Sequence, residues 1–124
     1  AHYYRAKAYL DASKTEAAME DLKVLAKDTR NVYGAEAKYK VAQIYFDGGQ
    51  TDKAEQEVLN YIEVSTPHTY WLARSFVLLA DVYMKLGRNL DAKQYLLSLK
   101  QNYQADDDIA GMIESRLEKL KIEN

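Results

Sequence analysis

Two histidines and a run of three aspartates are the side chains of this sequence whose types could bind a metal ion. His2 and His68 lie far apart in the chain and have no carboxylate pairs beside them, so they do not supply a zinc ligand set. We expect both to be exposed to solvent. Asp106, Asp107 and Asp108 are consecutive, without the alternating spacing and the glycine of a calcium loop. They are better placed at the N-terminus of a helix, where carboxylates complement the helix dipole, and the sequence predicts no metal site.

The sequence also lacks the patterns of a nucleophilic active site and of a phosphate-binding loop. The chain has no cysteine, which excludes thiolate catalysis and disulfide bonds. Its serines have no histidine and acidic residue in register with them, as an activated nucleophile would need. Gly48 and Gly49 are not followed by the lysine and hydroxyl residue of a phosphate-binding loop. We therefore predict that the protein is not an enzyme and needs no cofactor.

The length, charge and hydropathy of the chain limit the kinds of partner that it could bind. The chain has 124 residues, which is enough for one domain with its own core. With 17 basic and 19 acidic residues the net charge is −2, and this does not favour a nucleic acid, whose phosphates need a basic surface. No apolar run approaches the roughly 20 residues of a membrane span, so we predict no insertion of this segment into a membrane. Because Ala1 already lies within a helix-like pattern, we interpret the sequence as a piece of a longer protein.

The elements that would position any site come from an internal repeat. One block occurs three times, at offsets of 36 and 38 residues. In each copy a small residue is followed by a tyrosine three positions later, then by an alanine, and then by a large apolar residue. The matched positions are Ala6, Tyr9, Ala18 and Leu22, then Ala42, Tyr45, Ala54 and Val58, then Ala80, Tyr83, Ala92 and Leu96.

Each copy is expected to form two helices that pack closely through the small residues. Gly48 and Gly49 interrupt the helical pattern of the second copy, as glycines do at helix C-termini. Thr51 then lies where an N-cap residue is needed, and Thr15 and Asn89 occupy the matching positions of the other copies.

A last helix follows the third copy. Its apolar stripe is typical of a helix that covers the end of a stacked array, and consists of Ile109, Met112, Ile113, Leu117 and Leu120. We predict a single domain over residues 1–124, with copies at about 1–33, 34–68 and 69–104 and a capping helix at about 106–123.

The run from Leu86 to Ala92 resembles the turn between the two helices of a tetratricopeptide repeat, and the repeated small–Tyr–Ala–apolar pattern extends this resemblance over about residues 1–103. The family's usual aromatic residue, four positions before the small one, is matched by Phe76 but not by His2 or Lys38. The resemblance implies an all-α fold, a right-handed superhelix of about seven antiparallel helices. Copies of this length resemble those of bacterial envelope-associated members, which would imply an envelope-associated, periplasmic or cytoplasmic location.

The resemblance also implies a concave groove, lined by the first helix of each copy, in which a protein or peptide segment lies. The positions carried over are Tyr3, Lys7 and Leu10 in the first copy, Glu36, Tyr39, Gln43 and Phe46 in the second, and Arg74, Val77, Asp81 and Met84 in the third. Apolar side chains with scattered charges of both signs suit an amphipathic peptide. The same apolar side chains could equally pack between neighbouring helices.

We therefore predict a non-enzymatic protein–protein interaction scaffold. The alternative is a structural segment that associates with itself or with the rest of a longer array, in which case Tyr3, Tyr4 and Arg5 would be buried. Trp71 has two interpretations, as a binding hot spot or as a wedge between the second and third copies, and we favour the wedge.

Overall fold

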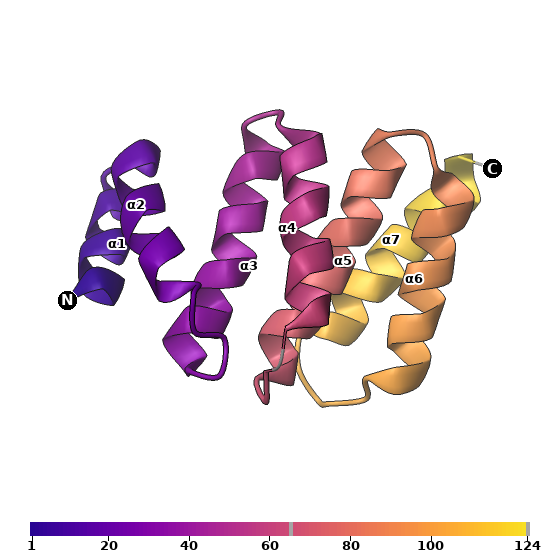
Figure 1. Cartoon of the computed structure of the whole chain (residues 1–124). Helices are drawn as coiled ribbons and strands as arrows, with labels where there is room; N and C mark the ends of the chain where they lie inside the picture. Colours follow the sequence, from indigo (N-terminus) through magenta and orange to yellow (C-terminus); the bar gives the residue numbers. More distant parts are fainter. Residues whose placement is uncertain (65, 124) are drawn as a thin grey trace. The chain divides into compact units, whose positions relative to one another are not determined.

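The computed structural model describes the backbone of residues 1–64 and 66–123, and the side chains among them as far as residue 121. These residues form seven α-helices and no strand (Figure 1). The predicted all-α class is confirmed. The helices are α1 (His2–Asp11), α2 (Thr15–Leu25), α3 (Val32–Asp47), α4 (Thr51–Glu63), α5 (Thr69–Lys85), α6 (Asn89–Asn102) and α7 (Ile109–Glu123).

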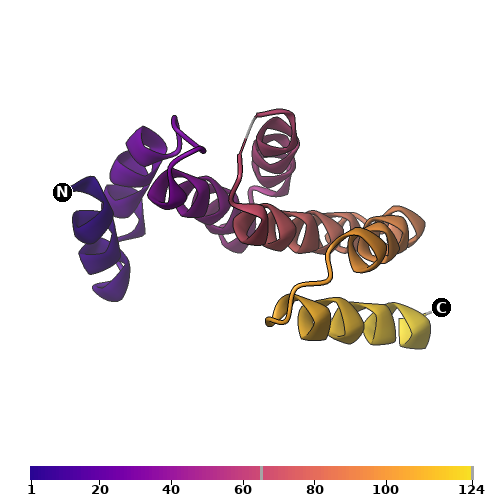
Figure 2. The same cartoon turned by 90° about the horizontal axis from the view of Figure 1, so that it is seen from below.

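The chain divides into two compact units, Ala1–Leu72 and Ala73–Asn124, and the division falls within α5. In the first unit α1 packs on α2, α2 on α3, and α3 on α4. Both views show α1 with α2, and α3 with α4, as neighbouring pairs (Figure 1 and Figure 2). In the second unit α6 packs on α7. The single domain over residues 1–124 stays a prediction.

The three turns within the copies share one backbone geometry. Each has three residues, and its middle residue has a positive φ: 60° at Ser13, 80° at Gly49 and 76° at Gly87. The next N–H donates to the carbonyl of the repeated tyrosine, in a bond that closes the preceding helix as a Schellman-type cap does. These bonds are Lys14 N to Tyr9 O at 2.7 Å, Gln50 N to Tyr45 O at 2.8 Å and Arg88 N to Tyr83 O at 2.8 Å.

This geometry also explains why the predicted N-caps are wrong. The expected residues Thr15, Thr51 and Asn89 are the first residues inside α2, α4 and α6. The residues before them are the N-caps, and their side chains make no capping hydrogen bond: Lys14, Gln50 and Arg88. Because the turn closes after three residues, the next helix begins one position earlier than a side-chain cap would allow. The prediction for the aspartate run holds, since Asp107 Oδ1 accepts from the N–H of Ile109, the first residue of α7, at 2.9 Å.

The small residues lie in the core, as the pattern predicts. Ala18, Ala54 and Ala92 are completely buried on the second helices. In the first unit Ala18 belongs to a cluster with Ala6 and Val41, against which the half-buried Tyr9 and other side chains pack. A methyl side chain at these positions lets two helix backbones approach closely, so a larger one has no room. On α7 the buried residues of the apolar stripe are Ile109, Ile113 and Leu120.

Candidate functional site

The first helices of the first two copies are joined by a tyrosine–carboxylate contact. The Tyr3 hydroxyl on α1 donates to Glu36 Oε1 on α3 at 3.2 Å, and Glu36 also pairs with Lys40 at 2.6 Å. Burial, and then the Glu36 charge, raise the pKa of the Tyr3 phenol above its ordinary value, so it keeps the proton that it donates. The ammonium group of Lys7 lies 5.5 Å from the Tyr3 ring centroid. Three of the predicted groove residues therefore lie together.

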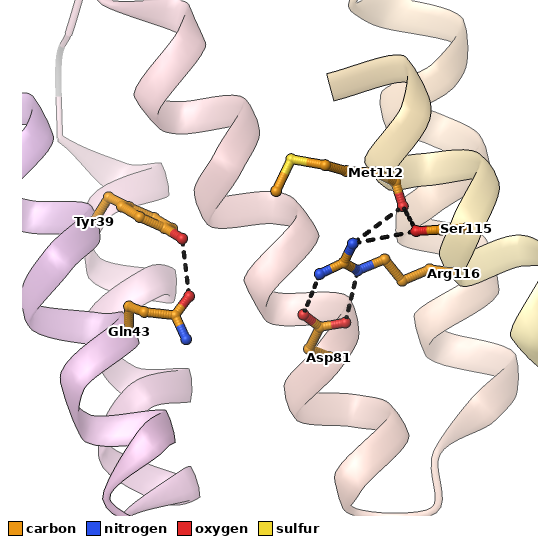
Figure 3. Close-up of polar contacts among 6 residues, drawn as sticks. All are labelled: Tyr39, Gln43, Asp81, Met112, Ser115 and Arg116. Atoms are coloured by element: carbon orange, nitrogen blue, oxygen red, sulfur yellow. Dashed lines mark hydrogen bonds and ion pairs between the residues drawn. The ribbon is translucent and has the colours of Figure 1, made fainter. Parts of the chain in front are cut away.

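A ladder of hydrogen bonds runs along α3. The Tyr39 hydroxyl donates to Gln43 Oε1 at 2.8 Å (Figure 3), and Gln43 Nε2 donates to Asp47 Oδ1 at 2.8 Å. A spacing of four residues places these three side chains on one face of the helix. Tyr39 is buried, Gln43 is half-buried and Asp47 is exposed, so the ladder leads from the core to the surface. The predicted groove residue Phe46 is half-buried on the same helix.

The Trp71 ring packs on the ring of Tyr39, a tyrosine of the second copy. Its ring centroid is 5.7 Å from that of Tyr39, and the rings are tilted by 34°. The same pair occurs one copy earlier, where the Tyr3 and Tyr33 rings are 4.4 Å apart. Sequence reasoning missed this recurrence, although the repeat offsets relate Tyr3 to Tyr39 and Tyr33 to Trp71. The contact supports the interpretation of Trp71 as a wedge that packs at the start of a new copy.

In the second unit the predicted groove residue Asp81 is paired with the last helix. Arg116 on α7 donates two hydrogen bonds of 3.1 Å, from Nε to Oδ1 and from Nη2 to Oδ2 of Asp81 (Figure 3). The guanidinium also reaches Ser115 Oγ at 3.3 Å and the Met112 carbonyl at 3.4 Å. A two-point pair of this kind fixes both side chains and neutralises the carboxylate. Arg116 was not among the predicted site residues.

The remaining predicted groove residues are spread over different surroundings. Val77 is 1% exposed and belongs to the core, so a partner cannot touch its side chain. Arg74 lies 3.9 Å from Asp108, and Met84 is half-buried. Leu10 packs against the core of the first unit and borders a hollow between α2 and α4, away from the Tyr3–Glu36 contact.

The third copy matches a known family. Residues 70–105 match a family model described as Tetratricopeptide repeat. This stretch of the chain is a tetratricopeptide repeat (TPR). The matched residues cover almost all of α5, the whole of α6 and the start of the connection to α7. Comparison with curated proteins and with solved structures gave no match.

Repeats of this family are typically protein–protein interaction modules, and the match supports a module of this general kind.

Both histidines of the TPR chain are half-buried as whole residues and make internal contacts, while the side chain of His2 is still 44% exposed. His2 opens α1, with Nδ1 at 2.7 Å from Asp21 Oδ1. His68 Nε2 lies 2.9 Å from the Arg30 carbonyl oxygen, which ties the two connectors between copies together. Across residues 1–64 and 66–121, whose side chains the structure describes, no group of three or more histidines or carboxylates could hold a metal ion.

The lengths and apolar character of the helices show whether any of them could cross a membrane. None of the helices among the described residues combines the length with the apolar character that crossing a membrane requires.

Proposed function

We propose that this TPR chain is a non-enzymatic scaffold that binds a peptide or protein segment along the face formed by its first helices. The observation that carries the proposal is the Tyr39–Gln43–Asp47 ladder. Gln43 accepts from Tyr39 and donates to Asp47, each at 2.8 Å, so its amide is held in one orientation. An amide fixed on both sides still has one N–H and one lone pair to offer, which is what a peptide backbone can pair with.

The surroundings of the ladder suit an amphipathic segment. Phe46 is half-buried on α3 and Tyr3 is half-buried on α1, so both have apolar area that a partner could cover. Lys7 and Glu36 bring charges of opposite sign to the same two helices. Apolar burial would provide most of the affinity, and the fixed amide and the charges would set the direction of the bound segment.

The test begins with selection of peptides from a random display library against the wild-type chain. The affinity of a selected peptide is then compared among the wild type, Gln43→Ala and Gln56→Ala. Gln56 is an exposed glutamine on α4 and serves as the matched control. We expect Gln43→Ala to weaken binding about fivefold, the value of one hydrogen bond, and Gln56→Ala to leave it unchanged.

A Phe46→Ser variant provides the second measurement. Its circular dichroism spectrum shows whether it is folded, and a folded variant should lose most of the affinity because the apolar contact is gone. Wild-type affinity in both folded Gln43→Ala and folded Phe46→Ser would exclude this face as the binding surface.

Self-association is the second candidate function, and one surface favours it. Tyr4 is 70% exposed, Val24 45% and Tyr33 43%, and they border a hollow of about 400 Å³ at the end of the first copy. Exposed aromatic and aliphatic side chains grouped in this way are typical of contact surfaces. Sedimentation velocity over a range of concentrations tests this candidate. Association should raise the mass of the wild type and be lost in Tyr4→Ser, whereas a constant monomer mass would exclude it.

A further inference from the structure

A groove between two second helices of the first unit has no role in the function proposed above. Side chains of α2 and α4 line it, together with Val41, Ile44 and Tyr45 of α3. Two hollows of about 740 and 260 Å³ make up this groove, and Lys23 borders both. We call it the lysine groove, because Lys23, Lys27, Lys38 and Lys53 all line it.

Two of these lysines converge on one ring. The ammonium nitrogen of Lys23, from α2, lies 5.7 Å from the centroid of the Tyr45 ring, and that of Lys53, from α4, lies 5.8 Å from it. A tyrosine ring attracts one cation weakly, but two cations beside the same ring also repel each other. A bound anion would relieve that repulsion.

The other charges of the groove do not supply this anion. Glu57 pairs with Lys38 at 2.6 Å, and Asp47 accepts the hydrogen bond from Gln43. Within residues 1–64 and 66–121, no carboxylate forms an ion pair with Lys23 or Lys53. Both ammonium groups are therefore available to a partner from outside the chain.

We propose that the lysine groove binds an acidic peptide segment, whose carboxylates pair with Lys23 and Lys53 above the Tyr45 ring. The charge complementarity comes from the two lysines, and the half-buried Met19 and Ile44 add apolar surface for the side chains between the carboxylates. Asp47 of the ladder also borders this groove, but Lys23, Lys53 and Tyr45 take no part in the ladder, so the two sites use different binding groups.

The groove favours a peptide over a nucleic acid. Glu16 and Asp47 also border it, and a phosphate backbone with a charge at every nucleotide would bring some of its phosphates against these carboxylates. A peptide can place neutral residues opposite Glu16 and Asp47 and acidic residues opposite the lysines.

The experiment measures fluorescence anisotropy of labelled peptides with the whole chain at low salt. The probes are a series of peptides with two glutamates at increasing separations in an alanine and leucine background. Each has a counterpart with glutamines. We expect at least one spacing to bind about fivefold more tightly than its counterpart, and this difference to shrink at high salt.

The double variant Lys23→Gln/Lys53→Gln should abolish that preference. The control is Lys93→Gln/Lys119→Gln, which removes the same charge from exposed positions of the second unit. It should keep the preference. If both double variants lost the glutamate preference equally, the preference would come from the overall charge of the chain, and the proposal would be overturned.

Two further outcomes would overturn it. One is the absence of a glutamate preference at every spacing with the wild-type chain. The other is tighter binding of a single-stranded oligonucleotide than of any peptide, lost in Lys23→Gln/Lys53→Gln, which would assign the groove to phosphate instead.

Discussion

The ammonium group of Lys38 on α3 lies 2.6 Å from Glu57 Oε1 on α4, and this pair fills a position that recurs in every copy. In the first copy the same two positions hold His2 and Asp21, with 2.7 Å between Nδ1 and Oδ1. Both are polar contacts between the two helices of one hairpin, and Asp21 is only 3% exposed. The residue types at both positions thus differ between the two copies, but a polar contact joins the two positions in each copy.

The third copy uses an aromatic contact at this position. Phe76 and Tyr95 hold the matching sites, with ring centroids 6.2 Å apart. Tetratricopeptide repeats usually have an aromatic residue where Phe76 stands. The first two copies have His2 and Lys38 at this position, and the family match covers residues 70–105.

Asp21→Asn should lower the acid sensitivity of the first unit. Hydrogen bonds from Arg5 and then from His2 hold the pKa of the Asp21 carboxyl well below its usual range. Such a group stabilises the fold above its unfolded pKa of about 4, and this contribution is lost as the pH falls from there towards the lower folded value.

Urea denaturation at neutral and at acid pH measures the difference. The wild type should lose more stability on acidification than Asp21→Asn, and the exposed control Asp106→Asn should behave as the wild type. The same pH dependence in all three proteins would contradict the role of Asp21.

Gly34→Ala should destabilise the first unit strongly. A Cβ atom at Gly34 would lie 1.8 Å from the Asp28 carbonyl oxygen and 2.7 Å from that of Leu25, so the backbone would have to move. We expect a loss of about 3 kcal/mol or more. At Gly111 on α7 no atom lies within 4 Å of such a Cβ, and Gly111→Ala should instead stabilise by up to about 1 kcal/mol. Thermal unfolding of both variants checks this contrast, and a similar melting temperature for the two would refute it.

Substitutions at the positive-φ positions of two turns should change the stability of the protein in opposite directions. Gly87 has φ of 76°, and Gly87→Ala should cost about 1 kcal/mol because an L-residue is strained there. Ser13 has φ of 60° at the matching position, so Ser13→Gly should relieve strain and be neutral or stabilising. Chemical denaturation measures both, and a stabilising Gly87→Ala would show that the turn adopts another conformation.

Ala54→Leu tests the close approach of the helices. Ala54 is fully buried, and a larger side chain should overpack α3 against α4 at a cost of about 1–3 kcal/mol. Ala110→Leu, at an exposed position of α7, is the control and should have little effect. Equal stability of the two variants would mean that the α3–α4 interface has room that the structure does not show.

The sequence was informative where one backbone geometry recurs. The three turns, the buried alanines and the stripe of α7 follow from residue types at fixed offsets, because they depend on local conformation and on which face of a helix is apolar. The N-caps failed for a local reason, since the tyrosine carbonyls close the turns before Thr15 or Thr51 can act as a cap.

Contacts between helices were harder to predict from the sequence than the turns and the buried alanines. The family register placed Val77 and Asp81 together on one groove, but Val77 is buried and Asp81 is paired with Arg116. Whether a side chain faces a partner or a neighbouring helix depends on a small rotation about the helix axis, which spacing along the chain does not fix. The pair Lys38–Glu57 was within reach, because both members change together from copy to copy.

The stepwise packing of α1 on α2, α2 on α3 and α3 on α4 has a consequence for how quickly the first unit forms. Each interface joins neighbours in the chain, so only short loops have to close before apolar surface is buried. Low contact order of this kind favours rapid folding, and either hairpin can serve as the starting point from which the next helix is added.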